Sequence, residues 1–128
     1  MKLAIVDLGT NSLRVDIYQM SKNEEIKLIH REKRMVRLGD GVFESGEFSK
    51  NIIKRGREAF LDVKTTLTER NVDRVIAFAT SAMRCAHNAD EFIDSVESDT
   101  GIRIKVISGI QEGELIAKGI LADRKSVV

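Results

Sequence analysis

The chain has 128 residues, of which 42% are hydrophobic and 32% charged, as in one folded globular domain. Its formal net charge of +1 excludes a non-specific nucleic-acid-binding protein, which needs a clear basic excess. A single cysteine, Cys85, excludes an internal disulfide and favours a reducing compartment. No apolar run is long enough for a signal peptide or a bilayer span, so we expect a cytoplasmic protein that binds neither nucleic acid nor membrane.

The amino-terminal part of the chain predicts three consecutive strands. Lys2 to Asp7 is an almost continuous apolar run, the pattern of a strand buried on both faces. After a turn at Gly9 to Ser12, the segment from Leu13 to Met20 alternates apolar and polar residues, as the half-buried second strand of a hairpin does. A third strand is expected over Ile26 to Lys33.

Two helices are predicted from capping signals and helical spacing. Ser49 is a candidate N-cap for a helix that runs to about Arg70, where Asn71 suits a left-handed stop. Asn88 followed by Glu91 has the spacing of a capping box and predicts a second helix that ends near Gly101. The Gly-rich, charged segment from 37 to 46 is expected to be a loop.

The remaining elements complete an alternating pattern. Short strands are expected over Arg74 to Ala79 and Arg103 to Ile107, and a last helix over about Glu112 to Ala122. This order predicts an α/β fold with a five-stranded mixed sheet and helices on both faces. Ser126 to Val128 looks like the start of a further strand, so we expect the chain to be part of a longer protein.

The most distinctive segment is Asp7-Leu8-Gly9-Thr10-Asn11-Ser12, between the first two strands. Gly9 allows close backbone approach, and the next three residues offer hydroxyl, amide and backbone N–H donors that suit a phosphate oxygen. A carboxylate that ends an apolar strand is costly without a partner or a role, and Asp7 could hold Mg²⁺ through water beside that phosphate. Ordinary turn chemistry would also explain the Gly, Asn and Ser residues.

DLGTNSLRVDIY (7–18) resembles the first phosphate-binding segment of the exopolyphosphatase / guanosine pentaphosphate phosphohydrolase family, within the actin-like ATPase superfamily. Three further segments match the family in order: KRMVRLGDGV (33–42), ATSAMRCAHNADEF (79–92) and VISGIQEGELI (106–116). The resemblance implies a ribonuclease-H-like domain of the actin-like ATPase fold. Residues 1–128 would form the N-terminal lobe, with the second lobe absent from this chain.

The resemblance also implies roles for individual residues. Asp7 would be the carboxylate on the magnesium side, Gly9, Thr10, Asn11 and Ser12 the phosphate loop, and Arg84 an arginine that faces the phosphate cleft. Glu112 corresponds to the glutamate that activates the attacking water, although an acid near a helix start is also favoured by the helix dipole alone. Glu114 is a nearby rival, at a position where the family more often has arginine.

The implied activity is magnesium-assisted hydrolysis that releases terminal phosphate from polyphosphate or guanosine pentaphosphate, with Glu112 as the base. One alternative is a non-catalytic sensor that binds an alarmone or polyphosphate. Another is a sugar or acyl kinase of the same superfamily, against which the TSAMR (80–84) and ISG-x-x-E (107–112) segments argue. A homodimer is the default expectation for the assembly. The family's second phosphate loop is expected directly after Val128, so residues 1–128 alone should bind weakly and turn over nothing measurable.

Basic residues cluster at 30–34 (HREKR), with Arg37 close behind. They could steer a polyanion toward the cleft, or they could form a solvated strand edge. We favour the solvated edge for His30, Arg31 and Lys33, and leave both explanations open for Arg34 and Arg37. Cys85 has no evident histidine partner and is expected to be a buried small hydrophobe.

Overall fold

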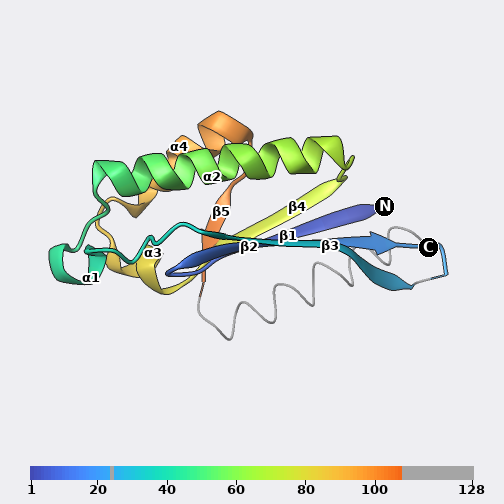
Figure 1. Cartoon of the computed structure of the whole chain (residues 1–128), viewed down its shortest axis with the longest axis horizontal. Coiled ribbons are helices and arrows are strands. Elements are labelled where there is room, and N and C mark those ends of the chain that lie inside the picture. Colours follow the sequence, from blue (N-terminus) through green and yellow to red (C-terminus); the bar gives the residue numbers. More distant parts are fainter. Residues whose placement is uncertain (24, 108–128) are drawn as a thin grey trace.

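The computed structural model describes residues 1–23 and 25–107, with Ser81 described by its backbone alone. Its five strands form one sheet in the order β3-β2-β1-β4-β5 (Figure 1). β1 is antiparallel to β2 and parallel to β4, β2 is antiparallel to β3, and β4 is parallel to β5. The predicted mixed sheet is therefore confirmed. The strands are β1 (Lys2–Leu8), β2 (Ser12–Met20), β3 (Ile26–Met35), β4 (Arg74–Ala79) and β5 (Ile104–Val106).

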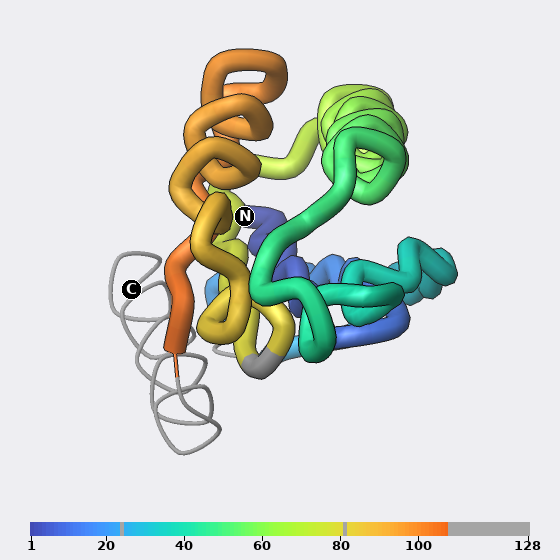
Figure 2. The backbone as a smooth tube through the Cα atoms, turned by 90° about the vertical axis from the view of Figure 1, so that its left-hand side faces the viewer, coloured from blue at the N-terminus to red at the C-terminus, as the bar shows by residue number. Residues whose placement is uncertain are grey.

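The two long helices, α2 (Lys50–Glu69) and α4 (Ala89–Thr100), lie side by side on one face of the sheet (Figures 1 and 2). The predicted start of α2 is confirmed, because the Ser49 side chain accepts a hydrogen bond from the Ile52 amide at 3.2 Å. Its end is also confirmed, since Asn71 follows the helix with a φ of 56°, in the left-handed region.

The contact between α2 and α4 depends on the absence of a side chain at Gly56. A Cβ placed there would lie 2.3 Å from Cε2 and 2.6 Å from Cζ of Phe92, so the ring occupies the space of the missing side chain. At the surface of the same interface, Arg57 donates two hydrogen bonds to Asp99, at 2.8 and 3.0 Å. These bonds lower the pKa of Asp99 and raise that of Arg57.

The sheet buries apolar side chains on both faces. The face under α2 and α4 carries the larger cluster, and the opposite face carries a smaller one that joins Leu3, Ile5, Met20 and Phe78. The period-2 alternation of the strands sends successive side chains to these two faces. The fully buried residues of the larger cluster include Val6, Leu8, Leu13, Val15, Ile17, Phe60, Val63, Phe92 and Val96.

Two short helices were not predicted from the sequence. α1 (Val42–Ser45) lies inside the segment expected to be a loop, and α3 (Ser81–Cys85) directly follows β4. The expectation for Cys85 was wrong, because its side chain is exposed at the end of α3. The helix expected over Glu112 to Ala122 lies outside the described residues.

The predicted capping box at Asn88 was also wrong. Asn88 precedes α4, but its side chain makes no cap hydrogen bond there. Its Oδ1 instead accepts from the Phe48 amide at 2.8 Å, and its Nδ2 donates to the Phe48 carbonyl at 2.9 Å. A third bond, from the His87 amide to the Gly46 carbonyl at 2.7 Å, ties the same two segments together. Asn88 therefore holds the segment after α1 against the segment after α3.

This architecture gathers chain ends and turns at one edge of the sheet. Because β1, β4 and β5 are mutually parallel, their carboxyl ends share an edge with the start of β2 and the end of β3. α1, α3 and the β1–β2 turn lie at this edge, on the left of Figure 1. Among residues 1–23 and 25–107, no helix is both long and apolar enough to cross a membrane.

Candidate functional site

The Gly9–Ser12 turn leaves part of its backbone free to bind a ligand. The Gly9 amide donates to the Ser12 carbonyl at 2.9 Å, which closes the turn. Within the described part of the chain, the amides of Thr10 and Asn11 donate to no backbone or side-chain acceptor. Two successive free N–H groups at a turn are the donors that a phosphate oxygen requires.

The carbonyls of the same turn are held by the segment after β3. The Val36 and Arg37 amides both donate to the Asn11 carbonyl, at 2.9 and 2.8 Å, and the Gly39 amide donates to the Thr10 carbonyl at 2.9 Å. In a trans peptide the C=O and the following N–H point in opposite directions. The Asn11 and Ser12 amides therefore point away from the segment at 36–39.

Arg37 has an unusual backbone conformation for a residue with a side chain. Its φ of 50° lies in the left-handed region, which costs a non-glycine residue roughly 1–2 kcal/mol. The Val36 and Arg37 N–H groups share the Asn11 carbonyl, and the left-handed turn at Arg37 redirects the chain that follows, whose Gly39 amide bonds to the Thr10 carbonyl. The donors of this segment are thus used to shape the turn and are not free for a ligand.

Asp7 lies at the open end of this arrangement. It lines a hollow of about 320 Å³ together with Gly9, Ser12, Arg14, Arg31 and Lys33. The Asp7 side chain is 23% exposed and its Oδ2 lies 3.9 Å from Nη2 of Arg14, a loose ion pair. The carboxylate that ends the first strand is therefore accessible from the hollow.

Asp16 anchors the cations of this hollow. It is a buried charged residue, 4% exposed, beside the cross-strand pair of Arg14 and Lys33. Arg31 donates to both of its oxygens, at 2.8 and 3.2 Å, and Nε of Arg14 lies 3.4 Å from Oδ2. The hydrogen bond to Asp16 is the main reason that the pKa of Arg31 is raised.

The donor set fits a magnesium ion that is shared with a bound phosphate. No group of three His, Cys, Asp or Glu side chains in the described ranges could hold a metal on its own. Mg²⁺ usually keeps several waters and uses one or two carboxylates together with substrate phosphates. One accessible carboxylate, Asp7, directly before a turn that offers backbone donors and lines the same hollow through Gly9 and Ser12, suits that mode of binding.

The other predicted site residues have different outcomes. Arg84 follows β4 at the same sheet edge and is exposed in α3, but it is not among the described residues that line the hollow with Asp7. Glu112 lies outside the described residues. Arg31 and Lys33, which we expected only to coat a strand edge, line the hollow.

Gly39 offers a direct test of the turn geometry. A Cβ at this position would lie 2.4 Å from Cγ2 of Thr10, so Gly39→Ala should displace Thr10 and weaken phosphate binding about tenfold. Binding is followed through the amide NMR signals of Thr10 and Asn11 during phosphate titration. The double variant, Gly39→Ala with Thr10→Ser, lacks the clashing methyl group. Phosphate should therefore shift the amide signals of residues 10 and 11 as it does in the wild-type chain.

Gly41→Ala is the matched control for this prediction. Gly41 has a φ of 76°, so alanine strains the backbone there, but no atom lies within 4 Å of the added Cβ. It should lower stability and leave the phosphate titration unchanged. Equal binding losses in both alanine variants would contradict a specific contact between Gly39 and Thr10.

The fold and the turn define a class of protein. A five-stranded mixed sheet with helices packed on it, and a turn with free donors after the first strand, is the ribonuclease-H-like domain of the actin-like ATPase fold. Residues 17–127 match the Ppx/GppA phosphatase family. The chain belongs to this family.

Similar proteins agree with this assignment. Exopolyphosphatase 2 of Mycobacterium tuberculosis is 35% identical over an alignment of 130 positions, which covers 95% of this chain and 41% of that protein. The crystal structure of an Aquifex aeolicus family member superposes with a TM-score of 0.84 at 34% identity, over 88% of this chain and 37% of that one. The crystal structure of an exopolyphosphatase from Cytophaga hutchinsonii also superposes with a TM-score of 0.84. It is 30% identical, over 90% of this chain and 36% of that one. The chain thus spans less than half the length of these relatives.

Proposed function

We propose that this chain supplies one lobe of a phosphoanhydride hydrolase that releases terminal phosphate from inorganic polyphosphate or guanosine pentaphosphate. The observation that carries the proposal is the turn directly after the accessible Asp7 carboxylate: its Thr10 and Asn11 amides have no acceptor among the described residues, and its Gly9 and Ser12 line the hollow with Asp7. The similarity to the Mycobacterium tuberculosis exopolyphosphatase over 95% of the chain supports the same substrate class.

In this proposal each part of the site has a defined task. The turn amides bind oxygens of the terminal phosphate, and Arg14 offsets negative charge that spreads over the group as the bond breaks. Magnesium held through water by Asp7 would add Lewis-acid stabilisation of the same charge. Glu112 orients the attacking water and accepts its proton.

The position of β5 supports a role for Glu112. The Ile107 amide donates to the Ala79 carbonyl at 2.9 Å, so β5 ends at the same sheet edge as β1 and β4. Glu112 follows Ile107 by five residues in the chain. A segment of this length can span up to roughly 18 Å, so the chain length after Ile107 permits Glu112 to act at the edge that holds Asp7.

The experiment is a phosphate-release assay with polyphosphate, guanosine pentaphosphate and ATP, on a protein that carries both lobes. We expect magnesium-dependent release from polyphosphate or guanosine pentaphosphate, and loss of release when a chelator removes the metal. Binding without release would favour the sensor. Phosphate transfer from ATP to a hydroxyl group would favour the kinase and contradict the proposal.

Asp7→Asn tests the magnesium site in the same assay. Removing the charge should raise the magnesium concentration needed for half-maximal activity about tenfold or more, because one of the few carboxylate contacts is lost. Asp40→Asn is the control, since Asp40 is an exposed aspartate whose Oδ2 lies 3.6 Å from Arg55 and which lies outside the hollow. Equal magnesium requirements in both variants would remove Asp7 from the metal site.

A further inference from the structure

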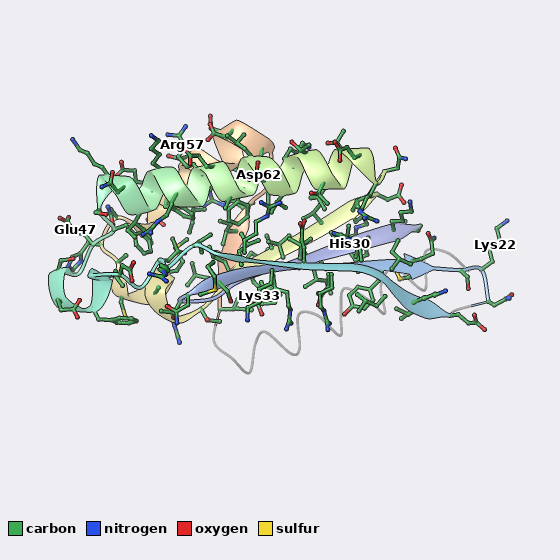
Figure 3. The ribbon with its side chains drawn as sticks, in the orientation of Figure 1. Lys22, His30, Lys33, Glu47, Arg57 and Asp62 are labelled. Atoms are coloured by element: carbon green, nitrogen blue, oxygen red, sulfur yellow. The ribbon has the colours of Figure 1, made fainter. Side chains whose placement is uncertain are left out.

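A row of charged side chains crosses three strands next to the turn. Asp7 on β1 pairs with Arg14 on β2, and Arg14 pairs with Lys33 on β3. Paired residues in neighbouring strands point to the same face of the sheet. Figure 3 shows Lys33 on the face of the sheet opposite α2.

Lys33 is the member of this row with an uncommitted charge. Arg14 lies within ion-pair distance of Asp7 and Asp16, and Arg31 is hydrogen bonded to Asp16. Among the residues that the structure describes, no carboxylate lies within ion-pair distance of the Lys33 amine. Its side chain is exposed and still lines the hollow with Asp7.

The distance across the row limits which ligands can reach Lys33. Asp7 and Lys33 are two strand spacings apart, or about 10 Å between backbones. A single phosphate ion at the turn spans much less than this backbone separation. A linear chain of phosphates can bind both places, because each unit carries its own negative charge.

Arg14 and Lys33 form a continuous basic part of this row that leads away from the turn. The donors at Val36, Arg37 and Gly39 are already bonded to the turn. On the β4 side of Asp7, the paired residue is Phe78, which is fully buried and carries no charge. On the β2 side, by contrast, Arg14 and Lys33 follow Asp7 directly in the row, whereas Phe78 separates Asp7 from Lys105 on β5.

We infer that Lys33, with Arg31 beside it, forms a second anion subsite that binds the internal phosphates of linear polyphosphate. This inference rests on the proposed function, and it names long-chain polyphosphate as the substrate class of the same site. The terminal phosphate binds at Thr10 and Asn11, and the rest of the chain crosses β2 toward β3. Affinity should then depend on chain length.

The test measures binding of orthophosphate, pyrophosphate and long-chain polyphosphate to the chain by NMR titration. Lys33→Ala should weaken the binding of long-chain polyphosphate about three- to tenfold and leave the affinity for orthophosphate unchanged. It should also lower the steepness of the plot of log affinity against log salt concentration by about 1. Lys33→Arg should retain the wild-type affinity. The signals of Arg31 and Lys33 should shift with the long chain and not with orthophosphate.

Lys22→Ala is the matched control, because it removes the same charge from the same β2–β3 hairpin. Figure 3 shows Lys22 at the far turn of this hairpin, away from Lys33. Both alanine variants could weaken the binding of long-chain polyphosphate equally, while polyphosphate still shifts the amide signals of Thr10 and Asn11. In that case the subsite is wrong and the proposed function stands. If no phosphate compound shifts Thr10 and Asn11, both proposals fail.

Discussion

Replacing Glu112 by glutamine should lower the rate of phosphate release from polyphosphate by about 10²- to 10⁴-fold, the usual contribution of a general base. Glutamine keeps the size and hydrogen-bonding capacity of the side chain but cannot accept a proton at neutral pH. The turnover number should therefore fall while the dissociation constant for polyphosphate stays nearly unchanged. Both are measured on a protein that carries both lobes, by orthophosphate release at saturating substrate and by equilibrium binding.

Glu114→Gln provides the matched control for this variant. It is the same chemical change two positions away, at a residue for which we propose no catalytic role. Its turnover number should stay within about threefold of the wild-type value, because a residue that takes no part in the reaction contributes no transition-state stabilisation. Full activity in Glu112→Gln would exclude Glu112 as the base, and a loss confined to Glu114→Gln would transfer the role to Glu114.

Gly56→Val should lower the free energy of unfolding by about 3 kcal/mol, at the upper end of overpacking penalties. The Phe92 ring that occupies this space is fully buried. It also packs against Phe48 and Phe60, with centroid distances of 5.9 and 6.4 Å, so it has little freedom to turn away. The small gain in helix propensity from replacing glycine offsets only a few tenths of a kcal/mol.

The measurement is urea denaturation of Gly56→Val, Phe92→Leu and the double variant. Leucine removes the ring atoms that clash, so the double variant should be at least 1 kcal/mol more stable than the sum of the two losses predicts. Strictly additive losses would show that the clash with Phe92 is not the cause. Lys54→Val, at an exposed position of the same helix, should change stability by less than about 0.5 kcal/mol.

The sequence predicted those elements whose pattern repeats over several residues. The alternation in β2 and the capped, periodic segment of α2 both depend on local spacing, and the structure confirms both. α1 and α3 are too short to show a helical period. The errors at Asn88 and Cys85 have a different origin, because the partners and exposure of these side chains are set by tertiary contacts.

The candidate site was predicted only in part, for a reason that lies in one strand irregularity. The segment at 7–12 contains its own turn, so its donors could be recognised locally. The role of Lys33 could not be recognised locally, because its cross-strand partner depends on the register between β2 and β3. That register shifts between Ile17 and Tyr18, with Ile29 as the extra residue on β3.

Without this bulge, a simple hairpin would place Glu32 opposite Arg14. The shift by one residue places Lys33 there instead and sends Glu32 to the other face. Local sequence patterns do not reveal such a shift. The charge of the hollow thus depends on a single inserted residue some distance from the turn.

The same irregular strand also bears on how the protein behaves at high concentration. β3 is an outer strand of the described sheet, and it exposes Leu28 and Ile29 beside its unpaired backbone groups. Such an edge can template the aggregation of identical chains unless a bulge and charged side chains interrupt it. Lys33 and the bulge at Ile29 therefore serve solubility as well, and substitutions that weaken polyphosphate binding here are expected to increase self-association.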